Sequence, residues 1–302
     1  MNLSQLKYIV EVERCGSITK AAQSLYMGQP NLSKAIKELE NEIGVPIFRR
    51  GAKGVEPTEK GRELLVYAKS VLAQVKKMES VSESTDTGKA SFSLVMPGAE
   101  YISYAFTLFL RELGSAERLD VRLAEADPLT GLDHVADCDH SLGIIRFPVS
   151  CEEHFLSCIE DRGLKARELW TYDLVAVASR KSVLSSEYEV TEKDLADGIE
   201  VWSEDLFPAL PGSAAPALGR RRICAKDRGT QADILSAEPN AFLLTTPVPR
   251  EFLRRCSLMQ KPCVSPRLTF RDVLLCHGSY RFTVTDKQFL DILDEVRRSI
   301  IV

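Results

Sequence analysis

A group of polar and basic side chains between positions 29 and 37 could recognise the edges of DNA bases. Asparagine and glutamine amides can pair with adenine, serine can bond to bases or phosphates, and lysine can neutralise a phosphate or reach guanine. Leu32, Ile36 and Leu39 recur at the spacing of one helix face, and Pro30 suits the first turn of that helix. The outward face then carries Gln29, Asn31, Ser33, Lys34 and Lys37. Such a face is typical of a major-groove helix, although a single polar helix face is more often merely solvated.

The residues just before this helix decide between the two interpretations. Gly16 can end one helix and Ser17 can cap the next, because its hydroxyl accepts an unpaired backbone N–H. Ala21 and Ala22 leave room for a second helix to cross closely, and a turn at 26–28 delivers that helix at once. The pattern therefore favours a DNA-binding helix-turn-helix.

A further helix and a hairpin are expected to flank this motif. Asn2 can cap a helix that runs to about Cys15 and packs behind the motif. After Gly44, an apolar segment at 45–49 and a return at 55–57 predict a two-stranded wing. The wing would hold basic side chains against the phosphates, where they add salt-dependent affinity and little sequence preference. These basic residues are Arg49, Arg50 and Lys53.

The segment 58–84 predicts one long helix. It begins after Pro57 at Thr58, contains no proline and has Gly61 as its single glycine, so it would extend roughly 40 Å. A coiled-coil stripe runs along it through Leu64, Ala68, Val71, Val75 and Met78. A single helix could bury this stripe against a second chain, which we favour, or against its own domain. A dimer would present two recognition helices and would read a pseudo-palindromic site.

The same N-terminal residues resemble the DNA-binding domain of the LysR-type bacterial transcriptional regulators. The shared pattern comprises Gly16-Ser17, Ala21-Ala22, Gln29-Pro30, Leu32-Ser33, Leu39-Glu40, Gly44, Phe48, Thr58 and Gly61. Gly28 departs from it, because the family usually has a serine cap there. Residues and resemblance together predict a DNA-binding set of Ser17, Thr19, Gln29, Pro30, Asn31, Ser33, Lys34, Lys37, Arg49, Arg50 and Lys53.

The rest of the chain predicts an α/β fold. A polar stretch at 82–90 is a hinge, and beyond it short apolar strands alternate with helices, as in parallel sheets. By resemblance, this part is similar to periplasmic binding proteins, with two α/β subdomains around an effector cleft. The expected domains are a winged helix-turn-helix at 1–57, a dimerisation helix at 58–84, a hinge at 85–90, and an effector domain at 91–302. Its first subdomain would comprise about 91–165 and 266–302, and its second about 166–265.

Ligands in open α/β sheets lie at the carboxyl ends of strands. That rule and the resemblance predict an effector site of Pro97, Gly98, Ala99, Glu100, Arg146, Phe147, Trp202, Ser203, Thr245 and Thr246. The Arg146 guanidinium could clamp a carboxylate or phosphate, or it could form an ion pair at the surface or at an interface. Glu100 disfavours a simple anion; it could pair with Arg146 or favour a ligand with an amine or hydroxyl.

Composition limits the other classes of function. A net charge of −4 confines any DNA-binding surface to a local patch, and no apolar stretch has the length of a membrane span. Eight cysteines occur without a CxxC or zinc-finger spacing, which suits reduced thiols in the cytoplasm. The metal-capable residues at 134–140 fit no zinc pattern, and catalytic signature motifs are missing, so we expect neither a metal nor an enzyme.

The sequence thus predicts a cytoplasmic, nucleoid-associated regulator that binds double-stranded DNA and a small-molecule co-effector, with no other cofactor. By resemblance it would form a homodimer or homotetramer and contact RNA polymerase. Three alternatives stay open: a transport-type binding protein, a redox sensor using Cys151 and Cys158, and an architectural DNA-binding protein without a ligand.

Overall fold

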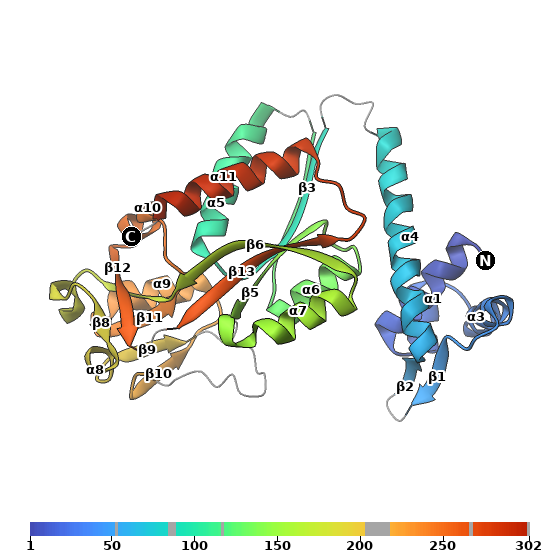
Figure 1. Ribbon diagram of the computed structural model, residues 1–302, viewed down its shortest axis with the longest axis horizontal. Helices are drawn as coiled ribbons and strands as arrows, with labels where there is room; N and C mark the ends of the chain where they lie inside the picture. The colour runs from blue at the N-terminus through green and yellow to red at the C-terminus, as the bar shows by residue number, and fades with distance from the viewer. Residues whose placement is uncertain (52–53, 84–88, 116–117, 203–217, 266–267, 301–302) are drawn as a thin grey trace. The chain divides into compact units, whose positions relative to one another are not determined.

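The computed structural model describes residues 1–51, 54–83, 89–115, 118–202, 218–265 and 268–300 (Figure 1). The chain divides into two compact units. The N-terminal unit comprises residues 1–87 with 136–138, and the C-terminal unit comprises residues 88–135 and 139–302. None of the helices in the described ranges is long and apolar enough to cross a membrane.

The N-terminal unit is a helix-turn-helix with a wing. Its elements are α1 (Leu3–Cys15), α2 (Ile18–Ser24), α3 (Gln29–Ile43), β1 (Phe48–Gly51), β2 (Gly54–Pro57) and α4 (Glu59–Glu83). Asn2 caps α1 in a capping box with Gln5, and Ser17 caps α2 by accepting a hydrogen bond from the Lys20 N–H. Gly16 ends α1 at φ +58°. The predicted helices and caps are confirmed, but the first wing strand begins at Phe48 and not at position 45.

One hydrophobic core joins the helices of this unit. Every helix contributes to it, through Leu6, Ile9, Val12, Ala21, Ala22, Leu32, Ile36, Leu39, Leu65 and Ala68, with Ile47 before the wing. The two alanines of α2 are buried, as the close crossing of α2 and α3 requires. The inner face predicted for α3 is confirmed.

Short backbone contacts fix the wing on this core. The Val55 N–H donates to the Gly16 carbonyl at 3.0 Å, and a Cβ on Gly54 would lie 2.5 Å from that same oxygen. The Glu40 carboxylate accepts hydrogen bonds from the backbone of Ile47 at 2.7 Å and of Phe48 at 3.2 Å. The wing therefore has a defined position relative to α2 and α3.

The C-terminal unit has two lobes, each built on one sheet. The sheet of the first lobe has the order β4-β3-β5-β13-β6, from β3 (Lys89–Met96), β4 (Arg118–Glu125), β5 (Leu142–Pro148), β6 (Leu164–Asp173) and β13 (Thr269–His277). β3 is parallel to β4 and β5, whereas β13 is antiparallel to β5 and β6, so the sheet is mixed and not purely parallel. Its helices are α5 (Glu100–Glu112), α6 (Pro128–Ala136), α7 (Glu152–Asp161) and α11 (Val284–Ile300), with 3₁₀ turns at Leu113–Ser115 and Val149–Cys151.

The helices of the first lobe cover both faces of its sheet (Figure 1). α5 and α11 pack on one face through an aromatic cluster of Phe92, Phe109 and Phe289. On the other face, Phe155 of α7 stacks on Phe147 of β5 at 4.7 Å between ring centroids. Gly131 of α6 lies closely over Ile145 of the same strand.

The second lobe has a sheet of order β10-β9-β11-β7-β12-β8. Its strands are β7 (Val175–Ser179), β8 (Val190–Thr191), β9 (Ile199–Trp202), β10 (Arg221–Cys224), β11 (Ala241–Thr245) and β12 (Leu258–Ser265). The helices are α8 (Glu192–Leu195), α9 (Arg228–Ala237) and α10 (Arg250–Arg255), with a 3₁₀ turn at Val183–Ser186. β12 and β8 were missed by the sequence analysis; Pro262 inside β12 weakens the strand pattern.

The chain crosses between the lobes twice, from β6 into β7 and from β12 into β13. At this crossing the Leu174 N–H donates to the Leu268 carbonyl at 2.9 Å. β6 continues in the first sheet to Asp173, beyond the limit of 165 expected for the first subdomain, because it pairs with β13 over its whole length. The two crossing segments are thus hydrogen-bonded to each other.

Candidate nucleic-acid interface and effector cleft

The outward face of α3 has the polar composition predicted for it. Leu32, Ile36 and Leu39 are buried, so the helix can turn only the opposite side to solvent. On that side Gln29, Asn31, Lys34 and Lys37 are exposed, and Ser33 is partly buried. The Gln29 amide donates to the Ser33 hydroxyl at 2.9 Å, and Lys34 lies 3.9 Å from Glu38. These exposed contacts are weak enough to be exchanged for contacts to DNA.

The other described residues that were predicted to contact DNA belong to the same unit as α3. Ser17 acts as a helix cap and Thr19 is exposed in the first turn of α2. Arg49 is exposed on β1 and forms an ion pair with Glu56 at 3.5 Å. Arg50 is opposite Val55 in the wing ladder, and Lys53 lies outside the described residues.

The stripe predicted for dimerisation is divided between two faces of α4. Ala68 is buried in the core of the N-terminal unit and Leu64 packs against it, so these two positions serve the helix's own domain. Val71 is 42% exposed and Val75 is partly buried. The Met78 side chain lies outside the described set. Tyr67, 63% exposed, joins Val71 one turn away on the outer face.

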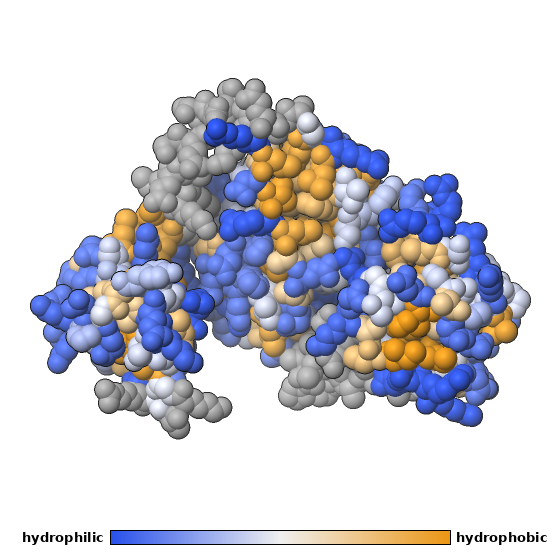
Figure 2. All heavy atoms as spheres, turned by 180° about the vertical axis from the view of Figure 1, so that it is seen from behind, coloured by the Kyte–Doolittle hydropathy of each residue, from blue (hydrophilic) through white to orange (hydrophobic). Residues whose placement is uncertain are grey.

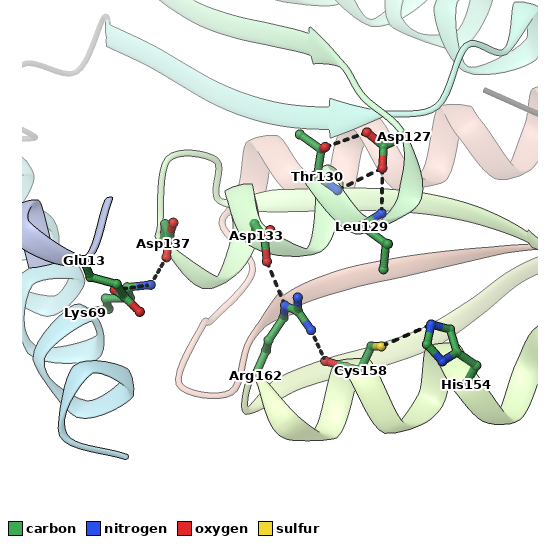
Figure 3. Close-up of polar contacts among 10 residues, drawn as sticks. All are labelled: Glu13, Lys69, Asp127, Leu129, Thr130, Asp133, Asp137, His154, Cys158 and Arg162. Carbon is green, nitrogen blue, oxygen red and sulfur yellow. Dashed lines mark hydrogen bonds and ion pairs between the residues drawn. The ribbon is translucent and has the colours of Figure 1, made fainter. Parts of the chain in front are cut away.

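An ion pair also holds α4 to α1. Lys69 Nζ lies 3.0 Å from Glu13 Oε2 (Figure 3). Because α4 lies along α1, the side of α4 that faces α1 is buried. The core contacts and the Lys69–Glu13 ion pair therefore explain why Leu64 and Ala68 are not available to a second chain.

A small cavity lies between the two lobes of the C-terminal unit and has a volume of about 60 Å³. The first lobe lines it with Pro97, Gly98, Glu100, Glu125 and Arg146. The second lobe contributes polar groups, among them Lys226, Arg228, Gln231 and Thr245, and an apolar wall that includes Val177, Leu235, Val248 and Phe252. The cavity thus lies at the carboxyl ends of strands and the first turns of helices, where open α/β sheets bind ligands.

Arg146 lines the cavity, but its charge is neutralised inside the protein. The guanidinium binds the Asp272 carboxylate at 2.9 and 2.8 Å and donates to the Gly98 carbonyl at 3.1 Å. Both side chains are buried. Of the two roles expected for Arg146, the ion pair is the one in the structure, but it is buried and does not lie at the surface.

Glu100 pairs with Arg228 and not with Arg146, which corrects the expected partner. Its Oε1 lies 3.5 Å from Arg228 Nη1. Burial raises the pKa of the Glu100 carboxyl, and Arg228 opposes that rise. Arg228 also contacts Glu125 and donates to the Ser103 hydroxyl at 2.9 Å.

Several residues predicted for the effector site do not present their side chains to this cavity. Phe147 is fully buried under α7, because successive residues of a strand face opposite sides and Arg146 takes the cavity side. Ala99 and Thr246 are also buried. Trp202 is covered by the Arg222 guanidinium, 4.4 Å from its ring centroid, and Ser203 lies outside the described residues.

The sequence analysis missed Glu125, Lys226 and Arg228. Glu125 ends β4, so the strand-end rule, applied to this strand as well, would have found it. Arg228 follows the helix cap Asp227, which accepts a hydrogen bond from the Thr230 N–H. Its contacts across the cavity depend on the tertiary structure and have no local signal.

The histidine and cysteine residues form no metal site within the described ranges. His134 Nδ1 lies 3.4 Å from Asp139, and its ring meets His140 edge-on. Cys151 and Cys158 are free thiols; the Cys158 sulfur lies 3.7 Å from His154 Nε2 (Figure 3). These contacts do not favour the redox alternative over ligand binding.

Comparisons with known proteins agree with this architecture. Residues 3–62 match the model of the bacterial regulatory helix-turn-helix proteins of the lysR family. The transcriptional regulator BudR of Raoultella terrigena is 26% identical over 72% of this chain and 70% of its own length. The RuBisCO operon transcriptional regulator of Allochromatium vinosum is 34% identical over 42% of this chain and 43% of its own.

Two solved structures share the fold over nearly the whole chain. A full-length OxyR variant from Pseudomonas aeruginosa gives a TM-score of 0.59 at 15% identity, covering 99% of this chain and 95% of that one. Full-length LysG from Corynebacterium glutamicum with bound effector Arg gives 0.58 at 16% identity, covering 98% of each chain. Fold and site define a DNA-binding regulator with a winged helix-turn-helix and a two-lobed α/β unit. Residues 3–62 are a helix-turn-helix domain of the lysR family of bacterial regulatory proteins, and the chain as a whole is similar to transcriptional regulators.

Proposed function

We propose that this regulator binds a pseudo-palindromic DNA site as a homodimer or homotetramer and answers to a small molecule bound between its lobes. The observation that carries the proposal is the outward face of α3, which holds amide and ammonium groups beside a rigid apolar core. Asn31 and Gln29 suit base edges, and Lys34 and Lys37 suit phosphates. Arg49 on the wing would add a backbone contact.

Exposed apolar side chains support the association of chains. Tyr67 and Val71 form an apolar strip on the outer face of α4, and a second copy of this helix would cover it. β4 is an edge strand of the first sheet and exposes Leu119 and Leu123. Figure 2 shows that hydrophobic residues reach the surface on the face turned away from Figure 1. The α4 strip suits a dimer, and a second surface of this kind suits a tetramer.

Effector control follows from the two-lobed unit. Two chain crossings connect the lobes, and the cavity between them is lined by charged groups from both sides. A ligand that binds one arrangement of the lobes more tightly than another shifts the population toward that arrangement. We propose that this shift alters the contact with DNA and with RNA polymerase, in the cytoplasm and at the nucleoid. No further cofactor is needed.

The test is a DNA-binding titration of the full-length protein. Its affinity for the DNA upstream of its own gene is compared with that for random DNA of equal length, at several salt concentrations. We expect a strong preference for an upstream palindrome and a steep loss of affinity with salt. Equal affinity for both DNAs at every salt concentration would overturn sequence-specific regulation.

A further inference from the structure

Arg228 connects the two lobes across the proposed effector cleft. It begins α9 in the second lobe, while Glu100 and Ser103 lie in the first turn of α5 and Glu125 ends β4 in the first lobe. Arg228 Nη1 lies 2.9 Å from the Ser103 hydroxyl and 3.5 Å from Glu100, and Nη2 contacts Glu125. One guanidinium from the second lobe thus meets two carboxylates of the first.

The charges around the cavity balance when Arg228 is in place. Among the described lining residues, Glu100 and Glu125 supply two negative charges, and Lys226 and Arg228 supply two positive charges. Arg146 adds none to this balance, because its partner Asp272 neutralises it. Any ligand that separates Arg228 from the carboxylates must compensate both signs, since an unpaired charge in a partly buried site is costly.

The need to compensate both positive and negative charges restricts which ligands can bind. An anion that captured Arg228 would leave Glu100 and Glu125 side by side without their shared partner. A cation that captured the carboxylates would leave the Arg228 guanidinium without an anion. A zwitterion replaces one ion pair within the protein by two with the ligand, so neither lobe keeps an uncompensated charge.

We propose that the ligand of this cleft is an α-amino acid. Its ammonium group takes the place of the Arg228 guanidinium between Glu100 and Glu125, and its carboxylate pairs with the released Arg228. This assignment rests on the proposed effector function of the cleft and specifies its ligand class.

The size of the cavity and its apolar wall restrict which α-amino acids can bind. A volume of about 60 Å³ is far below the roughly 300–1,000 Å³ of ordinary ligand pockets, so Arg228 must move before a ligand enters. The wall beyond the charged groups is apolar, with Val177, Leu235 and Phe252 among its residues. A side chain without charge fits this wall, which favours aliphatic and aromatic amino acids over acidic or basic ones.

Calorimetric titration of the full-length protein with the standard L-α-amino acids tests the proposal. Each amino acid that binds is compared with its N-acetyl derivative, which lacks the ammonium group, and with its α-amide, which lacks the carboxylate. We expect both derivatives to bind about 10- to 100-fold more weakly, because each leaves one charged partner unpaired.

Substitutions test whether Glu100 and Glu125 bind the amino acid. Glu100→Gln and Glu125→Gln should each lower the affinity for the amino acid about tenfold or more. Glu112→Gln, an exposed position at the other end of α5, should leave the affinity unchanged. Equal weakening by Glu112→Gln would remove the assigned role of the two carboxylates.

Two failures are distinguishable. If no amino acid binds, or if an N-acetyl derivative or a dicarboxylate binds as tightly as the free amino acid, the ligand class is wrong. The effector function would still stand if such an anion altered the DNA complex. Absence of specific DNA binding, measured without any ligand, would instead contradict the proposed function itself.

Discussion

Arg146 and Asp272 form a buried ion pair with two hydrogen bonds, at 2.9 and 2.8 Å, between neighbouring strands of the first lobe. Their side chains are 3% and 0% exposed. The Asp272 carboxylate also accepts hydrogen bonds from the hydroxyls of Tyr101, at 2.6 Å, and Tyr172, at 2.9 Å. Burial acts to lower the pKa of the Arg146 guanidinium, but Asp272 beside it holds that pKa above its ordinary value.

This cluster joins the cavity to the crossing between the lobes. Asp272 and Tyr172 lie on β13 and β6, the two strands of the first lobe that adjoin the crossings, while Tyr101 lies on α5. Replacing Asp272 by alanine should lower the free energy of unfolding of the C-terminal unit by about 3–5 kcal/mol, because the Arg146 charge stays buried without a partner. Chemical denaturation of the full-length protein measures this loss.

An exposed pair in the same lobe provides the control. Asp133 and Arg162 interact at 2.9 Å, and the Asp133 side chain is 59% exposed (Figure 3). Asp133→Ala should cost no more than about 1 kcal/mol. Similar losses for the two variants would show that burial does not set the strength of the Arg146 pair.

Gly61 tests the packing of α4 against the wing. A Cβ at this position would lie 2.0 Å from the Ile47 carbonyl oxygen, which is backbone and cannot yield. Gly61→Ala should therefore destabilise the N-terminal unit by about 1–3 kcal/mol or more, despite the better helix propensity of alanine, and weaken DNA binding.

Gly114→Ala is the matched change in the C-terminal unit, since nothing lies within 4 Å of its added Cβ. Thermal unfolding followed by circular dichroism compares the two variants. A Gly61→Ala protein as stable as Gly114→Ala would contradict the close approach of α4 to residue 47.

Asn31 and Lys34 are expected to make different contacts to DNA. Asn31→Ala should cost about 1–3 kcal/mol on the specific site and little on random DNA, because an amide reads base edges. Lys34→Ala should weaken both DNAs together and reduce the slope of log affinity against log salt by about 1. Fluorescence anisotropy at several salt concentrations measures both effects.

Lys193→Ala, at an exposed position of α8 in the C-terminal unit, controls for the loss of one positive charge. It should leave the affinity and the salt slope as they are. Equal losses of Asn31→Ala on specific and random DNA would remove the base-reading role of Asn31.

Val71→Glu should weaken the proposed dimer, because a carboxylate would lie in the apolar strip of α4. Sedimentation velocity over a range of concentrations should show the variant dissociating at concentrations where the parent protein stays associated. Val183→Glu is the control, since Val183 is 75% exposed in a 3₁₀ turn of the second lobe. A Val71→Glu protein that associates like the control would place the dimer interface elsewhere.

Glu11 should make the N-terminal unit sensitive to acid. Its hydrogen bonds with Arg14, at 2.9 and 2.6 Å, lower the pKa of the Glu11 carboxyl to about 2. The folded state therefore binds this proton less readily than the unfolded chain, whose glutamates titrate near about 4.3. The stabilisation is present above that value and is lost as the pH falls toward about 2.

Because the Arg14 side chain is 63% exposed, the effect should not exceed about 1 kcal/mol. The melting temperature of Glu11→Gln should fall less steeply than that of the parent protein in acid. Parallel profiles of the two proteins would contradict the coupling between Glu11 and Arg14.

Residue spacing within one segment predicted helix faces and helix ends correctly. The spacing of Leu32, Ile36 and Leu39 predicted which face of α3 is exposed, because a helix has one period and one core to meet. Gly16 marked a helix end, and it has a positive φ. For Arg146 local pattern gave the position but not the partner, since Asp272 is far away in sequence and only strand pairing brings it near.

The sequence by itself determined most of the elements, their order and the polar outward face of α3, since periodicity, caps and turn residues act over short distances. Only the tertiary structure decided which charges meet: Arg146 with Asp272, and Arg228 with Glu100 and Glu125. It also decided that Ala68 serves its own domain while Val71 stays exposed. Those outcomes depend on how distant strands and helices pack, and the energy of an ion pair or an apolar contact depends on the burial that this packing creates.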